Sequence, residues 1–156
     1  MFFKKLFVAG FALSSFSNSL SAQTMDEVAA CAGVVAGNGA IDLFVGDEKK
    51  FTDAMDVAYY AYLPSANGTR AILNFTDEER AFTSKILSSN MDKMINAYNS
   101  ENYDLALYEE IVGCYRMLGT VLLRPDIQGD LKVAKDDYDE VKEKTISNIR
   151  RLFSAQ

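Results

Sequence analysis

Two cysteines, Cys31 and Cys114, carry the most distinctive chemistry of the sequence. A cysteine is a nucleophile only as the thiolate, whose formation needs a nearby base, cation or metal. The chain of 156 residues contains no histidine, so the usual activating base is missing. Each cysteine lies on an apolar helical stripe, Cys31 with Val28 and Val35, and small residues surround both. Small neighbours let two helices approach within disulfide range, so we predict a structural disulfide between Cys31 and Cys114.

The lack of histidine also removes the common catalytic and metal-binding arrangements. Ser-His-Asp triads and the usual zinc, haem and di-iron sites all use this side chain. Acidic residues cluster at 77–79, where they suit the dipole at a helix start. A second cluster at 136–140 lacks the glycine and the spacing of a calcium loop. We therefore expect no catalytic residue, no metal site and no cofactor. A hydrolase working with two carboxylates is the remaining enzymatic alternative.

Tyrosine and methionine side chains offer a different kind of site. Tyr59 and Tyr62 lie on the apolar stripe of a helix, and Tyr60 points away from it. An interior lined by such side chains suits a small apolar or aromatic ligand, although most stripes of this kind are simply core. The candidate pocket residues are Met55, Tyr59, Tyr62, Met91 and Met94.

The first 22 residues have the pattern of a secretory signal peptide. Lys4 and Lys5 precede an apolar run from Leu6 to Phe16, and small residues lead to Ala22. The apolar run is too short for a membrane-spanning helix, and we expect no membrane span after the signal peptide is cleaved. A disulfide agrees with export, since such bonds persist in oxidising compartments. We predict a secreted or periplasmic protein.

The charge of the mature chain limits its partners. Loss of Lys4 and Lys5 with the signal peptide leaves 14 basic and 22 acidic residues, a formal charge of −8. Nucleic acids and anionic membranes are therefore not expected as partners. Residues 130–156 carry equal numbers of both signs, so the excess lies in residues 23–129.

Helical periodicity predicts five helices in the mature chain, and no segment has the pattern of a strand. Thr24 and Thr76 begin capping boxes, and we expect one kinked helix of about 20 residues through Gly37-Asn38-Gly39. A second helix should stop at Pro64, and a fourth should end before Pro125, with residues 124–130 as a linker. The fold class is therefore all-α: an up-and-down four-helix bundle over residues 23–129, stapled between its first and fourth helices, with an additional C-terminal amphipathic helix over residues 130–156.

The last helix is a candidate partner surface, because four helices already close a bundle. It should fold back along the bundle or dock on another chain, including a second copy. Its stripe contains Leu131, Tyr138, Val141, Ile149, Leu152 and Phe153. Overall, we expect a small exported protein that acts through protein contacts. Sequons begin at Asn67 and Asn74 and matter only in a eukaryotic host.

Overall fold

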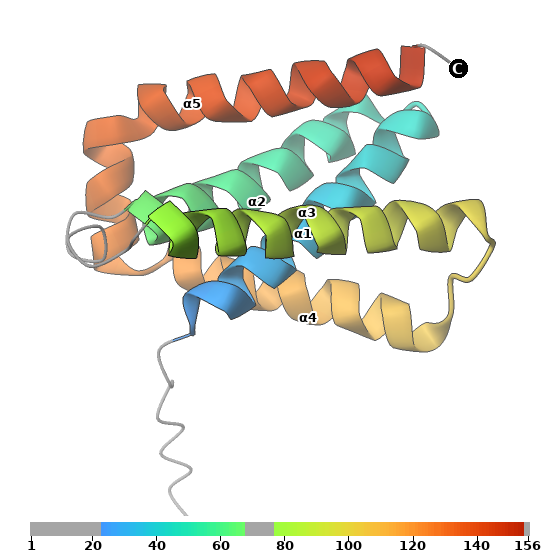
Figure 1. The fold of residues 1–156 in the computed structure, drawn as a ribbon, viewed down its shortest axis with the longest axis horizontal. Helices are drawn as coiled ribbons and strands as arrows, with labels where there is room; N and C mark the ends of the chain where they lie inside the picture. The colour runs from blue at the N-terminus through green and yellow to red at the C-terminus, as the bar shows by residue number, and fades with distance from the viewer. Residues whose placement is uncertain (1–22, 68–76, 155–156) are drawn as a thin grey trace, which may run out of the picture.

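The structure is a computed structural model that describes residues 23–67 and 77–154. The predicted signal peptide, the Thr76 cap and the Asn74 sequon lie outside these residues. The described part is all-helical, with α1 (Met25–Phe44), α2 (Glu48–Asn67), α3 (Asp77–Asn99), α4 (Leu105–Leu122) and α5 (Pro125–Ser154). Consecutive helices run in alternating directions (Figure 1). The predicted fold class is confirmed at the level of an all-α protein.

Helix α1 begins where the capping box places it. The hydroxyl of Thr24 accepts a hydrogen bond from the backbone N–H of Glu27 at 3.3 Å. The carboxylate of Glu27 accepts from the backbone N–H of Thr24 at 2.8 Å. Two of the unpaired N–H groups at the helix start are satisfied in this way. The helix then continues for 20 residues as one element through Gly37-Asn38-Gly39, so its expected continuity is confirmed, while the kink stays a prediction.

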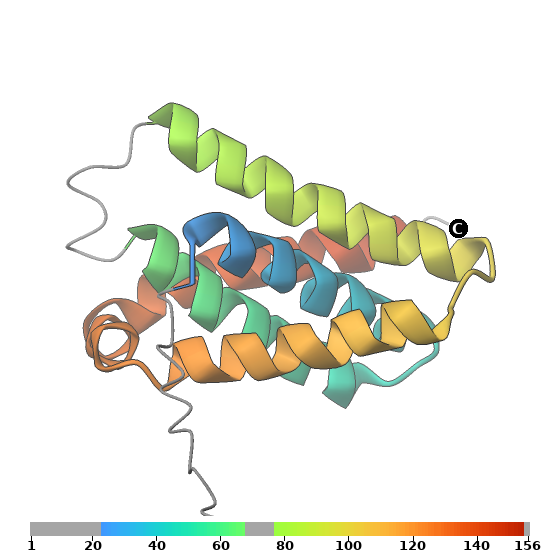
Figure 2. The ribbon, with the colours of Figure 1, turned by 90° about the horizontal axis from the view of Figure 1, so that it is seen from below.

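Helix α1 lies at the centre of the molecule, between α3 on one side and α4 on the other (Figure 2). Within the described residues it is the one helix long and apolar enough to cross a bilayer by composition. Ten of its 20 residues are buried against other helices, which is the pattern of a central core helix.

The arrangement of neighbours differs from a square up-and-down bundle, in which the first and third helices are diagonal. Here α1 packs extensively on both α2 and α3, while α2 contacts α1, α4 and α5. Gly33 permits the close approach of α3, since a Cβ built there would lie 2.2 Å from the carbonyl oxygen of Leu87. Helix α5 covers the side of α2 that a square bundle would give to α3. The core is therefore formed by five helices, whereas the sequence predicted a core formed by four.

Two predicted helix boundaries were wrong. Helix α2 does not stop at Pro64 but continues to Asn67 with the proline inside its last turns. Proline removes one N–H donor there, and the Ser65 hydroxyl bonds to the carbonyl oxygen of Ala61 at 2.7 Å in the same turn. The predicted linker 124–130 is instead helical from Pro125 onward, because Pro125 occupies the first position of α5, where its fixed φ suits a helix.

Helix α5 changes direction once and then folds back along the bundle. Its backbone leaves helical geometry at Ala134 (φ −120°, ψ 17°). Beyond that bend it runs beside α2 (Figure 1). Arg150 pairs with Glu48 at the far end and lies 5.9 Å from the ring centre of Phe51. Of the two outcomes expected for this helix, the structure shows the fold-back.

Candidate functional site

The tyrosine and methionine side chains proposed as a pocket lie in the packed core. Met55 and Met94 are 0% exposed, and Tyr59 and Tyr62 are buried beside them. Met91 packs against the same cluster from α3. The structure therefore brings these residues together, with their side chains in contact with the rest of the core.

The two buried tyrosines also have polar partners. Burial raises the pKa of Tyr59, and its hydroxyl interacts with Thr145 of α5. Burial likewise raises the pKa of Tyr62, whose hydroxyl interacts with Thr83 of α3. Each hydroxyl thus bonds across a helix interface, as buried tyrosines usually do. These bonds account for the tyrosines as structural groups of the core.

The proposed partner stripe on α5 is divided by the fold-back. Tyr138 and Ile149 are buried, and Leu131 is partly buried against the bundle. Val141 remains 46% exposed. The side chains of Leu152 and Phe153 lie outside the described part of the chain. Docking of another chain on this helix stays a prediction.

The predicted disulfide joins α1 to α4. Cys31 and Cys114 are bonded, with their Cα atoms 4.8 Å apart. Cys114 is buried and Cys31 partly buried. The bond closes a loop of 83 residues, so it constrains most of the mature chain. Neither cysteine is a free thiol.

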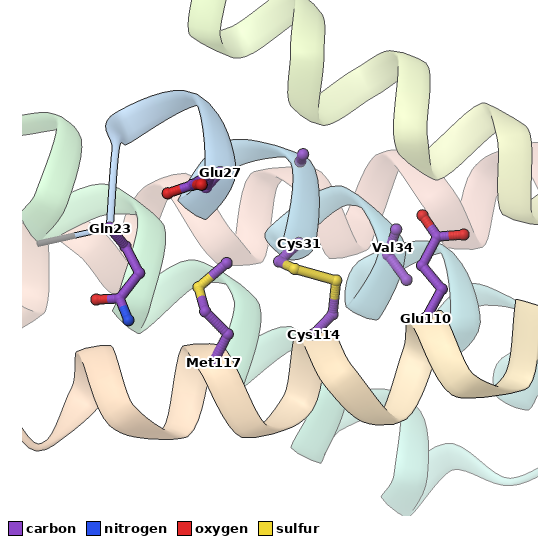
Figure 3. A pocket seen from close by; sticks show the side chains of 8 residues that line it. Gln23, Glu27, Cys31, Val34, Glu110, Cys114 and Met117 are labelled. Atoms are coloured by element: carbon purple, nitrogen blue, oxygen red, sulfur yellow. A yellow bond between two sulfur atoms is a disulfide. The ribbon is translucent and has the colours of Figure 1, made fainter. Parts of the chain in front are cut away.

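A surface groove of about 410 Å³ lies over this disulfide. Figure 3 shows that its residues come from the segment just before α1, from the first half of α1 and from α4, with the disulfide joining the two helices. We call it the disulfide groove; it is lined by Gln23, Glu27, Ala30, Cys31, Val34, Glu110, Cys114 and Met117. Its floor is therefore largely apolar and sulfur-containing, and its polar groups are two carboxylates and one amide.

Both groove carboxylates already have partners within the chain. Glu27 belongs to the capping box of α1 and is exposed. Glu110 accepts hydrogen bonds from Lys93 at 2.8 and 2.7 Å. A general acid of the glycosidase type needs a carboxyl group in a desolvated environment. Neither groove carboxylate is in such an environment, because Glu27 is exposed and Glu110 is paired with Lys93.

A polar cluster between α2 and α5 was missed by the sequence analysis. Lys142 is only 6% exposed, and its ammonium group lies 2.5 Å from Asp56 Oδ1 and 2.8 Å from the Tyr60 hydroxyl. Tyr60 donates to Asp139, and Lys135 donates to Tyr60 at 2.9 Å and to Asp139 at 2.6 Å. We call these five residues the α2–α5 cluster.

The α2–α5 cluster contains two positive and two negative side chains around one tyrosine. Hydrogen bonds from Lys135 and Tyr60 hold the pKa of Asp139 well below its usual range. Burial works to lower the pKa of Lys142, but bonds to Asp56, Tyr60 and Asp139 outweigh it and raise the pKa. Both ammonium groups also face the Tyr60 ring, at 4.9 Å for Lys135 and 4.5 Å for Lys142. The charged forms of Lys135, Asp139 and Lys142 are therefore stabilised by their neighbours.

The only sequence signal for this cluster was helical spacing. Asp56 and Tyr60 are four residues apart, as are Lys135 and Asp139. Such pairs are typical of solvated helix faces, and nothing in the sequence says that two of them meet. Among the described residues, no group of three or more cysteines and carboxylates is placed to hold a metal ion.

Comparison of the sequence and structure with family models, curated proteins and solved structures gives no match. The geometry of the chain is therefore the basis for the proposals that follow.

Proposed function

We propose that the mature protein is an exported, non-enzymatic binding protein that acts through contact with another protein. The disulfide groove carries this proposal. Its volume of about 410 Å³ falls in the range of roughly 300–1,000 Å³ that is common for binding sites. It lies on the rigid part of the fold, because the bond between Cys31 and Cys114 fixes the two helices that form it. A preformed, fixed site loses little entropy on binding.

The chemistry of the groove favours a basic, apolar segment of a partner protein. Ala30, Val34 and Met117 offer apolar contact, and methionine adapts well to varied shapes. Glu27 and Glu110 offer negative charge beside them. Lys93, which pairs with Glu110, is half exposed, and such surface pairs contribute about 0–1 kcal/mol. A guanidinium or ammonium group of a partner would therefore compete with Lys93 at small cost.

Export supports the same proposal. The signal pattern of residues 1–22 and the disulfide both agree with an oxidising compartment. The formal charge of −8 on the mature chain attracts basic partners over distances of about a Debye length. The absence of histidine from the sequence leaves the chain without the most common general base.

Selection of peptides on the immobilised, oxidised mature protein tests the proposal. A phage-displayed library of random peptides should yield sequences in which Lys or Arg stands next to apolar residues. Their affinity is then measured by calorimetry on the wild type and on Ala30→Trp, which fills the groove. We expect Ala30→Trp to weaken binding about tenfold or more, since the large ring occupies the peptide site.

Ala81→Trp is the matched control, because Ala81 is exposed on α3 and does not line the groove. It should bind the selected peptides as the wild type does. Selected sequences without a basic bias, or equal affinity for Ala30→Trp, would count against this function.

A further inference from the structure

Helix α4 carries two apolar stripes: one is buried in the core, and the other is exposed at its start and partly buried further along. The core stripe contains Leu107, Ile111, Cys114, Leu118 and Val121, all buried. The second stripe follows steps of three and four residues, the spacing of the a and d positions of a coiled coil. We call it the α4 seam; it contains Leu105, Tyr108, Val112, Tyr115, Gly119 and Leu122.

The α4 seam is exposed at its N-terminal end, whereas Tyr115 and Leu122 are partly buried against the core of their own chain. Leu105 is 71% exposed and Tyr108 is 60% exposed, while Val112 is partly buried. Leu123, beside the other end of the seam, is 81% exposed. A Cβ built at Gly119 would meet no atom within 4 Å, so the seam has a notch at this position. Large apolar side chains that remain solvated on a helix are typical of contact surfaces.

We propose that the α4 seam binds the α4 seam of a second copy of this chain in an antiparallel pair. A twofold axis between residues 113 and 114 places Tyr108 opposite Gly119 of the second copy. The same axis places Leu105 opposite Leu122 and Val112 opposite Tyr115. The large ring of Tyr108 thus fills the notch at Gly119, and this fit occurs twice because the contact is symmetric.

The charges beside the seam fit the same arrangement. Glu109 and Arg116 are both exposed and stand seven residues apart, at equivalent flanking positions of the seam. In the antiparallel pair each Glu109 lies beside Arg116 of the second copy, so two ion pairs form across the axis. In a parallel pair Glu109 would instead lie beside Asp104 of the second copy, which carries the same charge. The charge pattern therefore selects the second copy in the antiparallel direction.

This surface is separate from the disulfide groove. The groove takes Glu110, Cys114 and Met117 from another side of α4. Helix α4 has 18 residues, whereas stable complexes use roughly 20–30 residues a side. We therefore expect a weak, reversible dimer.

Sedimentation of the oxidised mature protein from about 5 to about 500 µM tests the inference, in about 0.15 M salt to screen its negative charge. The average mass should rise with concentration towards twice the monomer mass. Gly119→Phe fills the notch and should weaken the dimer about tenfold or more. Gly113→Phe is the matched control: Gly113 is open and exposed on the same helix but lies off the seam, and this variant should dimerise as the wild type does.

The charge swap identifies the pairing itself. Glu109→Arg places a positive group beside Arg116 of the other copy and should weaken the dimer. Arg116→Glu should weaken it as well, because it places a negative group beside Glu109 of the other copy. The double variant E109R/R116E should recover the wild-type affinity, because the ion pairs reform in the reversed sense. A monomer at every concentration would overturn the proposal. A dimer that ignores Gly119→Phe, or a double variant weaker than both single ones, would do so as well.

Discussion

Lys142 on α5 donates a hydrogen bond to Asp56 on α2 at 2.5 Å, although only 6% of Lys142 is exposed to solvent. The two residues are 86 positions apart in the sequence. Tyr60 and Asp139 bind the same ammonium group, so all its donors have acceptors near them. This bond fixes the position of the C-terminal helix on the bundle more specifically than apolar contacts alone would.

Replacing Lys142 with Met should destabilise the protein by about 1–3 kcal/mol. The variant keeps most of the apolar stem, but Asp56 and Asp139 lose a charged donor. Both carboxylates are partly exposed, at 41% and 32%, so water replaces part of the lost interaction. Urea unfolding monitored by circular dichroism measures the change.

Lys132→Met is the control for this experiment, because Lys132 is exposed on the same helix. It should change the free energy of unfolding by no more than about 0.5 kcal/mol. Equal stability of Lys142→Met and the wild type would show that the α2–α5 cluster does not hold α5 in place.

Acid should weaken the α2–α5 cluster through Asp139. Bonds from Lys135 and Tyr60 keep the folded pKa of this carboxyl below its unfolded value of about 3.9. A lowered folded pKa stabilises the protein above the unfolded pKa, and this contribution disappears as the pH falls through the folded value. We therefore expect Asp139→Asn to destabilise the protein at neutral pH but to flatten the loss of stability below about pH 4.

The exposed Asp137 on the same helix provides the comparison. Asp137→Asn should have nearly the same stability as the wild type at neutral pH. Its loss of stability as the pH falls below about 4 should also be close to that of the wild type. Melting temperatures between about pH 2 and pH 7 give both quantities. If Asp139→Asn and the wild type lost stability equally below about pH 4, Asp139 would not be the group through which acid weakens the cluster.

The sequence predicted the local features of this fold well. The Thr24 capping box depends on residues three positions apart, and its two hydrogen bonds are present. The pairing of Cys31 with Cys114 followed from the absence of other cysteines and from two apolar stripes. The capping box needed only the spacing of neighbouring residues, and the disulfide needed only the fact that two cysteines can pair in one way.

The contacts between distant segments could not be predicted from the sequence. Lys142 and Asp56 each appear as a charge on a solvated helix face, and their meeting depends on how α5 bends at Ala134. The disulfide groove likewise depends on how α1 and α4 pack on either side of the bond between Cys31 and Cys114. The small residues around the cysteines were assigned to disulfide packing, but the missing side chain of one of them, Gly33, faces α3. Such features follow from packing, which helical periodicity does not specify.

Reduction of the disulfide should destabilise the protein strongly. In the chain-entropy model, freeing a loop of 83 residues costs about 4 kcal/mol of stability. The double variant C31A/C114A should show a similar loss in urea unfolding, measured beside the oxidised wild type. The wild type should contain no free thiol in a thiol-reagent assay without reductant. Unchanged stability of the double variant would mean that helix packing alone holds α1 against α4.

Two glycine substitutions on different helices test the central position of α1. Gly33→Ala should destabilise the protein by about 1–3 kcal/mol, because the new methyl group meets the backbone of Leu87 at 2.2 Å and α3 must move away. Gly113→Ala has the opposite expectation: the site on α4 is open, and alanine favours a helix over glycine by about 1 kcal/mol. Urea unfolding of both variants gives the comparison, and helix propensity alone would stabilise both. A stabilised Gly33→Ala variant would therefore show that α3 does not approach α1 closely in solution. That result would favour a square four-helix bundle, in which these two helices are diagonal.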